Sequence, residues 1–277
     1  MSFLGVDGIG KTTLSREVGS YLESQGFTVR HVAWRPLLSG EGRQWPGDAL
    51  QELWVEAFRL LFAGGQRAGE PLRMPRDYRS WSEAGWENSL KDSHVTGVRP
   101  VGPLAAALVE LAANLVVAAE QIQPALARGE VVLQESFPFK HVIKEVLISR
   151  RITTDRSSWS QTARLMRTFF KDIFNAFPLR PHVGVLVHGP VDLAYRWRMA
   201  QSGSLGVLED YGAAGEKGEA AFTRLQRETA DIFHRAARDW DWLVHRVDDG
   251  GLHANLARGL DLVLSHPEVA RFTAPHR

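Results

Sequence analysis

The chain has 277 residues, a formal net charge of +1 and no cysteine. The lack of cysteine excludes disulfides, cysteine zinc sites and a cysteine nucleophile, and the near-neutral charge gives no reason to expect a nucleic-acid partner. An apolar fraction of 44% is sufficient for a hydrophobic core. We see no signal peptide and no apolar run long enough to span a bilayer, so we expect a cytoplasmic protein without a membrane partner.

The first motif stands at the start of the chain, in GVDGIGKTTL, Gly5 to Leu14. The spacing of Gly5, Gly10, Lys11 and Thr12 is the phosphate-loop pattern. Glycines let successive backbone N–H groups point at phosphate oxygens. The lysine reaches the terminal phosphates as a point charge, and the threonine hydroxyl can ligate Mg²⁺. A short apolar run precedes the loop and helical spacing follows it, which is the strand–loop–helix context that the motif requires.

We therefore predict that this loop binds ATP and that Thr12 holds Mg²⁺. The alternative is a chance glycine-rich turn. The predicted nucleotide-binding residues are Gly5, Asp7, Gly8, Ile9, Gly10, Lys11, Thr12 and Thr13.

Short β-rich runs alternate with longer helical patterns along the rest of the chain. Strands separated by helices indicate a parallel sheet with helices on both faces. We predict one α/β domain, 1–277, with a five-stranded parallel sheet whose carboxyl ends carry the chemistry. The predicted strands are 2–4, 28–34, 130–135, 182–188 and 242–247. The predicted helices lie near 103–128, 139–150, 158–177, 191–201, 219–239 and 252–265.

One segment, 37–100, departs from this alternation. It contains one helical stretch, 48–62, followed by a tract rich in Gly, Pro and Trp that includes WSEAGWENSL, and it has no obvious sheet strand. We expect an inserted, largely helical segment packed over the sheet. It is either a lid or acceptor-binding element, or a surface excursion.

Three further stretches accompany the phosphate-loop motif: WRP at 34–36, QIQPALARGEVVL at 121–133 and PHVGVLVHGPVDLAYRWR at 181–198. Together they resemble the thymidylate kinase-like group of phosphate-loop kinases, outside the 37–100 segment. The resemblance implies a three-layer P-loop NTPase fold, ATP with Mg²⁺ as the phosphoryl donor, and an arginine-bearing lid helix after the fourth strand. The pair Glu135-Ser136 also partly resembles the deoxynucleoside kinases.

The chain departs from thymidylate kinases where that family binds its acceptor. The third strand of the family ends in Asp-Arg-aromatic, but this chain has Glu135-Ser136-Phe137. An Arg and a Gln on the preceding helix align with Asn114 and Val116. Unpaired charge in a cleft is costly, so these losses indicate a remodelled acceptor site for a less charged acceptor. Some positive charge can be restored by Lys140, Lys144, Arg150 or Arg151.

The candidate catalytic residues are Lys11, Glu135, Asp7, Arg196 and Arg198. Lys11 holds the donor phosphates, and the two arginines close over the transferring group or are surface residues of an amphipathic helix. Glu135 accepts the acceptor's proton, holds Mg²⁺ through water, or caps the next helix. By the resemblance Asp7 meets the acceptor sugar. It can also be a base or make a loop-shaping hydrogen bond.

The candidate acceptor-binding residues are Arg35, Asn114, Phe137 and Lys140. Arg35 contacts the acceptor or makes an ion pair at a strand end. Aromatic side chains stack on a flat acceptor or pack in the core, namely Trp34, Trp81, Trp86 and Phe137. The histidines show no metal-ligand spacing, and His188 at a strand end is expected to be structural.

Neither a guanine-recognition motif nor an Asp-Glu pair after the fourth strand is present, which argues against a GTPase or a motor ATPase. We therefore expect transfer of the γ-phosphoryl group from a nucleotide donor to a small molecule, either a nucleoside, a nucleoside monophosphate or a related metabolite. The first alternative is a specialised-metabolite or antibiotic hydroxyl kinase whose pocket is the Trp-rich segment. The second is a non-catalytic nucleotide-binding regulatory protein. A homodimer is possible for such a fold.

Overall fold

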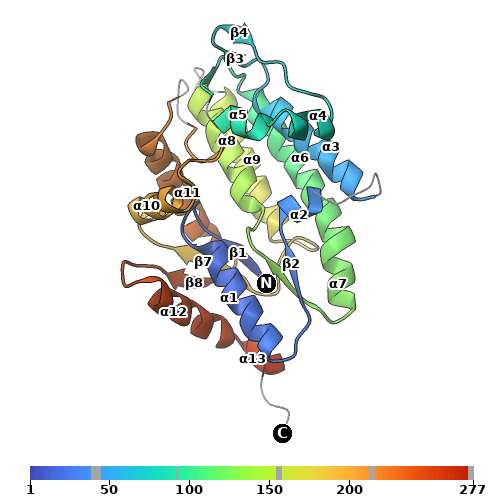
Figure 1. Cartoon of the computed structure of the whole chain (residues 1–277), viewed down its shortest axis with the longest axis vertical. Helices are drawn as coiled ribbons and strands as arrows, with labels where there is room; N and C mark the ends of the chain where they lie inside the picture. Colours follow the sequence, from blue (N-terminus) through green and yellow to red (C-terminus); the bar gives the residue numbers. More distant parts are fainter. Residues whose placement is uncertain (39–44, 92, 154–157, 212–215, 274–277) are drawn as a thin grey trace.

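The computed structural model describes residues 1–38, 45–91, 93–153, 158–211 and 216–273. Its centre is a five-stranded sheet in the order β2-β6-β1-β7-β8, with every neighbouring pair parallel. The carboxyl ends of the strands point toward the top of Figure 1. These strands are β1 (Ser2–Leu4), β2 (Val29–Val32), β6 (Val131–Gln134), β7 (Gly184–His188) and β8 (Leu243–Arg246). The predicted parallel sheet of five strands is confirmed, and the arrangement is compatible with a Rossmann-like or a phosphate-loop fold.

The three inner strands are largely apolar because helices cover both faces of the sheet. Adjacent residues of β1 belong to different hydrophobic clusters: Phe3 joins the cluster of Leu14, and Leu4 joins that of Phe233. On one face lie α1 (Lys11–Ser24) and α12 (Leu252–Leu264). On the other lie α6 (Val101–Val117), α8 (Phe139–Ile152), α9 (Ser158–Phe174) and α11 (Glu219–Asp239). The remaining helices of the main body are α10 (Val191–Ser202) and α13 (Pro267–Thr273).

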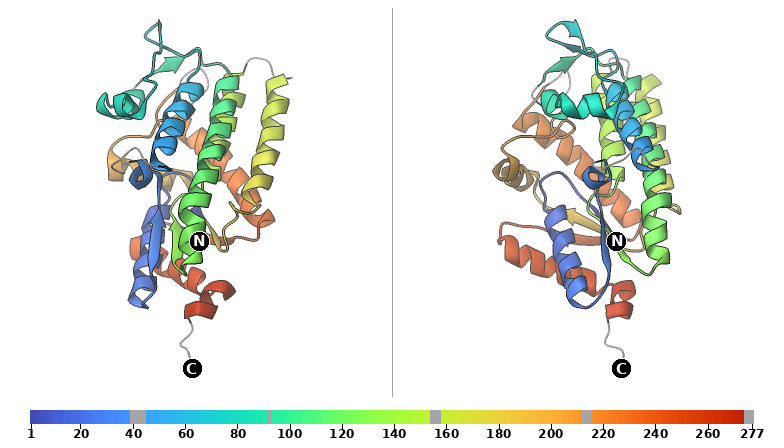
Figure 2. Two further views of the ribbon diagram at one scale, coloured as in Figure 1. Left: turned by 90° about the vertical axis from the view of Figure 1, so that its right-hand side faces the viewer. Right: turned by 45° about the vertical axis from the view of Figure 1, so that its right-hand side comes forward.

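The short helices and strands of the inserted segment lie above the carboxyl ends of the main-sheet strands (Figures 1 and 2), whereas its longest helix packs alongside α6. Its helices are α2 (Trp34–Leu38), α3 (Gly47–Leu61), α4 (Tyr78–Glu83) and α5 (Trp86–Lys91). A small antiparallel sheet in the order β4-β3-β5 accompanies them, formed by β3 (Gln66–Arg67), β4 (Glu70–Pro71) and β5 (Val95–Thr96). These strands correct the expectation of a strand-free segment; two residues are too few to produce a recognisable alternation.

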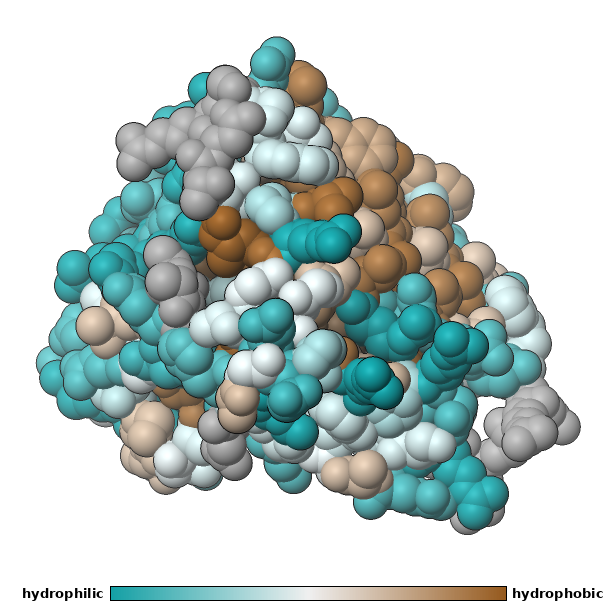
Figure 3. Space-filling view, turned by 90° about the horizontal axis from the view of Figure 1, so that it is seen from above, coloured by the Kyte–Doolittle hydropathy of each residue, from teal (hydrophilic) through white to brown (hydrophobic). Residues whose placement is uncertain are grey.

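The helical stretch before β6 is continuous and strongly apolar. α6 continues through a π-helical turn, η1 (Ala118–Ile122), into α7 (Gln123–Ala127). By length and composition this Val101–Ala127 helix is apolar enough to cross a membrane, so the expectation that no apolar run has that length was wrong. Just over half of its most apolar window is buried inside the protein, and it packs against α3 and α8. In the view from above, apolar side chains gather on the right-hand side, where α6 lies in Figure 1 (Figure 3).

Candidate functional site

The segment between β1 and α1, residues 5–10, is called the glycine loop below. Gly8 and Gly10 have φ angles of 78° and 94°, in the left-handed region that favours glycine. A Cβ atom at Gly8 would lie 2.2 Å from the carbonyl oxygen of Ala194 in α10, and one at Gly5 would lie 2.4 Å from that of Val187 in β7. The glycines therefore allow the loop to pass closely against β7 and α10.

The backbone amides of the glycine loop and the first turn of α1 form a row of free donors. Within the described part of the chain, the amides of residues 8 to 13 donate to no protein acceptor. The flanking amides are satisfied: that of Asp7 donates to Oε1 of Gln226 at 3.3 Å, and that of Leu14 donates to the Gly10 carbonyl at 3.0 Å. Consecutive free donors at the positive end of a helix favour an anion.

The ammonium group of Lys11 lies beside these amides in a buried position. The residue is 7% exposed, and its Nζ donates to the carbonyl oxygen of Val6 at 2.6 Å. Burial and then the positive charge of Lys140 hold the pKa of Lys11 well below its ordinary value. An anion at the loop would favour the charged form of Lys11 and compete with the Val6 carbonyl for its ammonium.

Asp7 is the centre of a buried ion cluster beneath the loop. Its Oδ1 accepts from Nζ of Lys140 at 2.7 Å, and its Oδ2 accepts from Nζ of Lys144 and, at 3.1 Å, from Nε2 of Gln226. Burial alone would raise the pKa of Asp7, but the charges of Lys140, Lys144 and Lys11 outweigh it and hold that pKa well below its ordinary value. Asp7 is therefore a poor proton acceptor.

The ion cluster contains more positive than negative charge. Lys11, Lys140 and Lys144 share the single carboxylate of Asp7. The nearest other carboxylate, Glu209, is bound by the guanidinium of Arg198, with Nε and Oε2 2.8 Å apart. Uncompensated buried charge is costly, so an incoming anion would complete the charge balance of this region.

Glu135 stands at the carboxyl end of β6, next to β1 and the glycine loop in the sheet order. Its side chain is 18% exposed, and Oε1 lies 3.9 Å from Nε of Arg16 in α1. The following helix, α8, has no side-chain cap at its N-terminus. Of the three roles predicted for Glu135, the helix cap is therefore wrong.

The two arginines of α10 point to different surroundings. Arg198 reaches the ion cluster through Glu209, and its Cβ lies 2.8 Å from a Cβ built at Gly8. Arg196 is directed outward: its guanidinium is 58% exposed and lies 3.2 Å from the carboxylate of Asp249, after β8. The fold brings Arg198, and not Arg196, toward the glycine loop.

Three of the predicted acceptor-binding residues do not meet Lys140 at the ion cluster. Phe137 is 1% exposed and packs edge-on against Trp242, with ring centroids 4.9 Å apart, so its expected acceptor contact is replaced by core packing. Asn114 is 2% exposed, and its amide donates to the Glu110 carbonyl one turn earlier in α6. Arg35 lies in α2, after the end of β2, and its side chain is 82% exposed and lies 3.3 Å from the carboxylate of Glu87.

Thr12 is in the first turn of α1 and is partly exposed, with no hydrogen bond recorded for its hydroxyl among the described residues. The described residues contain no group of three His, Cys, Asp or Glu side chains suited to a metal ion. Mg²⁺ does not require such a group, because it is commonly held by one or two protein oxygens together with phosphate oxygens and water. The donor set thus fits a metal that arrives with a phosphate ligand.

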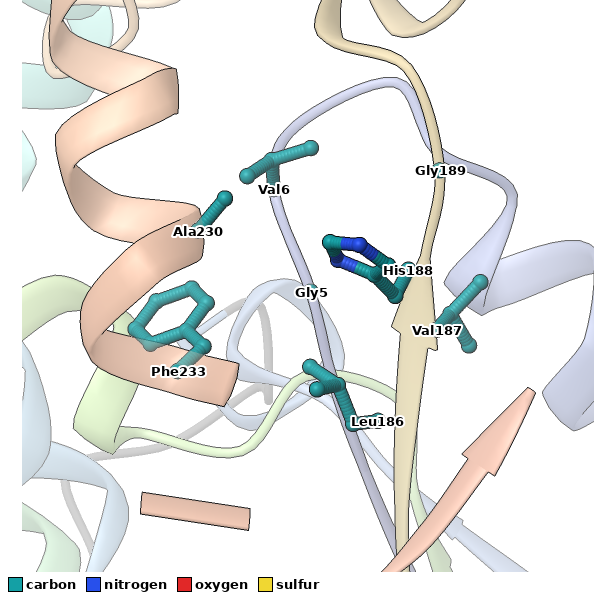
Figure 4. A pocket seen from close by; sticks show the side chains of 8 residues that line it. All are labelled: Gly5, Val6, Leu186, Val187, His188, Gly189, Ala230 and Phe233. Atoms are coloured by element: carbon teal, nitrogen blue, oxygen red, sulfur yellow. The ribbon is translucent and has the colours of Figure 1, made fainter. Parts of the chain in front are cut away.

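His188 lies behind the glycine loop and lines a small hollow. Figure 4 shows its ring projecting from β7 toward the loop, opposite Ala230 and Phe233 of α11. The hollow has no room for a water molecule. Burial, the neighbouring His234 and Arg246 lower the pKa of His188, which favours its neutral form. These observations fit the structural role expected for this residue.

Sequence reasoning assigned no role to Glu209 and Gln226, and it named Lys144 only as one of four residues that could restore positive charge. Lys144 follows Lys140 by four residues, a spacing that puts both ammonium groups on one face of α8. Gln226 is fully buried on the apolar face of α11, and a glutamine among apolar helical positions was the available signal. Glu209 lies in an irregular segment after α10, where no periodicity marks it.

No protein-family profile matches the chain, and no curated protein sequence is significantly similar to it.

Proposed function

We propose that the protein is an ATP-dependent phosphotransferase and that the glycine loop is its phosphate loop. The free amides of residues 8 to 13, grouped with the buried ammonium of Lys11, carry this proposal. These donors are consecutive and lie at a helix N-terminus, as do the donors with which phosphate loops bind the β and γ phosphates. The excess of buried lysines over carboxylates in the ion cluster is consistent with a polyanionic ligand.

The fold and the sequence motifs support the same class of protein. The first strand lies between the third and fourth strands of the main sheet, so its loop opens at the centre of the carboxyl edge. Ligands of open α/β sheets bind at that edge. The GVDGIGKTTL motif and its likeness to thymidylate kinase-like proteins then favour a kinase with a three-layer P-loop NTPase fold over a dinucleotide-binding protein.

Each side chain of the site has a proposed part in the transfer. Lys11 and the loop amides hold the donor phosphates, and Arg198 exchanges Glu209 for the transferring group. Mg²⁺, held by the Thr12 hydroxyl, would neutralise phosphate charge. Glu135 accepts the proton of the acceptor hydroxyl as the phosphoryl group moves onto that oxygen. Asp7 holds Lys140 and Lys144 in position and does not accept the proton, because a carboxylate with a lowered pKa is a poor base.

The acceptor belongs to the nucleosides, nucleoside monophosphates and related metabolites, with a hydroxyl acceptor favoured by the position of Glu135. A second candidate is a hydroxyl kinase for another small molecule. It is favoured by one observation, an aromatic pocket of about 330 Å³ formed in the inserted segment.

Release of ADP from ATP and Mg²⁺ tests the function, with nucleosides, nucleoside monophosphates and other hydroxyl compounds offered as acceptors. We expect acceptor-dependent release in the wild type, and at least ~100-fold slower turnover in Glu135→Gln with ATP affinity unchanged. Glu130→Gln, which removes a carboxylate from the opposite end of β6, is the matched control. Tight ATP binding without release for any acceptor would contradict transfer and leave a nucleotide-binding regulatory protein. Equal turnover in Glu135→Gln would remove Glu135 as the base.

A further inference from the structure

The inserted segment contains a pocket that the glycine loop does not explain. It has a volume of about 330 Å³, near the lower end of the range for small-molecule sites. Helices α2, α3, α4 and α5 all contribute to its lining, chiefly through Arg35, Trp54, Tyr78, Trp81, Trp86 and Glu87. Apart from Arg35, the residues that line it come from the part of the chain that the family resemblance does not cover.

The wall of this aromatic pocket is a connected set of rings. Trp81 and Trp86 are nearly parallel, with an interplanar angle of 23° and centroids 6.2 Å apart. Phe58 links Trp81 to Trp54, at centroid distances of 4.8 and 5.1 Å. Such rigid, flat surfaces favour a flat partner, because stacking needs little loss of side-chain freedom.

Trp86 is held in place from outside the pocket. The guanidinium of Arg67 lies 5.4 Å from the centroid of the Trp86 ring, and Arg67 is not among the lining residues. The same guanidinium donates to Oγ of Ser89 at 2.7 Å, which ties it to α5. A ring fixed in this way is preorganised for binding.

The polar groups of the aromatic pocket indicate the charge of its ligand. The carboxylate of Glu87 lies 3.3 Å from Arg35 and 3.9 Å from Lys91, so two cations share one anion. Among the described residues, the hydroxyls of Tyr78 and Ser82 have no recorded hydrogen bond. The excess positive charge would repel a cationic ligand. A neutral or anionic ring could donate hydrogen bonds to the Glu87 carboxylate and accept them from the two hydroxyls and the cations.

The pocket lies above the carboxyl edge of the sheet, the edge at which the glycine loop also lies. Arg35 is in the first turn of α2, which begins just after β2, and the carboxyl end of β2 lies at the same sheet edge as the loop. Figure 2 shows α4 and α5 above α2, on the same side of the molecule as α10.

We propose that the aromatic pocket binds the acceptor, and that the acceptor carries a flat heteroaromatic ring that is neutral or anionic. The ring stacks on the partly exposed Trp86, which Trp81 backs from the core, and Glu87 accepts a hydrogen bond from a ring N–H. The acceptor part of this inference rests on the proposed phosphotransferase activity, whereas the preference for flat rings does not.

Binding to the full chain tests the inference, by calorimetry or ligand-observed NMR, with adenosine, thymidine and benzimidazole as flat probes and glycerol and sorbitol as flexible ones. We expect the flat probes to bind, with at least ~10-fold loss in Trp86→Ala, since stacking on one aromatic residue commonly contributes that much. Glu87→Gln should weaken only probes with a ring N–H. Trp45→Ala is the matched control, because Trp45 belongs to the same segment, is 60% exposed and does not line the pocket.

The outcomes separate the two proposals. Flat-probe binding that persists in Lys11→Ala and under saturating Mg·ATP supports a pocket distinct from the donor site. Equal binding by the wild type, Trp86→Ala and Glu87→Gln, or competition by Mg·ATP, would overturn the pocket without affecting nucleotide binding. Flat-probe binding by a wild type that binds no Mg·ATP would contradict the phosphotransferase and leave the ring preference standing. Glu87→Gln keeps the test valid if Trp86→Ala does not fold.

Discussion

The glycine loop and the aromatic pocket lie at the same edge of the sheet but are built from different parts of the chain. The loop offers main-chain donors above a cluster of charged side chains that are nearly all buried. The pocket offers aromatic rings, with its charges at an exposed rim where Arg35 is 82% exposed. The main-chain donors of the glycine loop suit an anion of constant geometry, such as a phosphate group. The aromatic pocket suits a ligand recognised by shape and stacking.

This difference determines how each region should respond to mutation. Removing a charge from the buried cluster leaves its partners uncompensated, so the fold itself is affected. Removing a charge from the rim of the pocket leaves groups that water can solvate, so stability changes little.

Asp7→Asn should give the largest effect, a loss of about 3–5 kcal/mol in the free energy of unfolding. It leaves the buried ammonium groups of Lys140 and Lys144 without their counter-ion. The control is Asp192→Asn, whose side chain is 64% exposed and which should stay within about 0.5 kcal/mol of the wild type. Urea unfolding monitored by circular dichroism measures both.

The stability lost in Asp7→Asn should depend on pH, because folding lowers the pKa of Asp7. The pKa of Asp7 is lower in the folded state than its ordinary value of 3.8, so its stabilisation is complete above 3.8 and is lost as the pH falls through the folded pKa. The difference between the wild type and Asp7→Asn should therefore shrink below pH 3.8. A stability difference that does not change with pH would contradict a stabilising role for the Asp7 carboxylate in the ion cluster. So would a variant that is as stable as the wild type at neutral pH.

Lys11→Ala comes next, with Mg·ATP affinity reduced at least ~30-fold, because a charge-assisted contact to phosphate contributes roughly 2 kcal/mol or more. Stability should not fall, since the variant removes an ammonium group from a region that already has excess positive charge. Calorimetric titration and thermal unfolding measure the two properties. Lys171→Ala is the control, because Lys171 is a surface residue paired with Asp239 far from the loop. Unchanged affinity in Lys11→Ala would remove this residue from the donor site.

Alkaline pH should have a smaller effect on the affinity for Mg·ATP than Lys11→Ala has. The pKa of Lys11 is lowered in the ligand-free protein, so its ammonium begins to lose its proton below the ordinary value of 10.5. Phosphate binding restores the charged form, and Mg·ATP affinity should then fall by at most about tenfold per pH unit above the lowered pKa. Calorimetry in buffers of different ionisation enthalpy should register proton uptake on binding. Affinity independent of pH up to 10, with no proton uptake, would contradict a buried, perturbed Lys11.

The smallest effect concerns the two arginines of α10. Arg198→Ala should lower turnover, because Arg198 faces the loop through Glu209, while Arg196→Ala should leave turnover within about twofold, since a surface ion pair contributes little. Steady-state kinetics on the two variants gives a matched comparison within one helix. A larger loss of turnover in Arg196→Ala than in Arg198→Ala would mean that α10 rotates when substrate binds. Arg196 would then be the residue that approaches the phosphate.

Much of the fold was predictable because its signals are local. Each of the five parallel strands was found as a short β-rich run, and the helices between them follow from the 3.6-residue period. The end of β2 was placed two residues too late, at Trp34, because the strand ends at Val32 and Trp34 already belongs to α2. The two-residue strands of the inserted segment have no periodicity to detect.

The site was predictable in part, for a related reason. The glycine loop is specified within a few consecutive residues, so its conformation follows from the motif. The partners of Asp7 are far away in the chain: Lys140 lies 133 positions later and Gln226 lies 219 positions later. For Phe137 the local signal was misleading. Its position at the end of a strand suggested that it faces a cleft, but its large ring packs against Trp240 and Trp242 in the core.

The free amides of residues 8 to 13 are the central claim, and backbone amide NMR tests it most directly. Titration of the ¹⁵N-labelled protein with Mg·ATP, and separately with inorganic pyrophosphate, should shift the amide resonances of those residues most strongly and saturate at one equivalent. The amides of the inserted segment should move little with pyrophosphate. Unchanged resonances at residues 8 to 13 under saturating Mg·ATP, or shifts confined to other parts of the chain, would contradict the account.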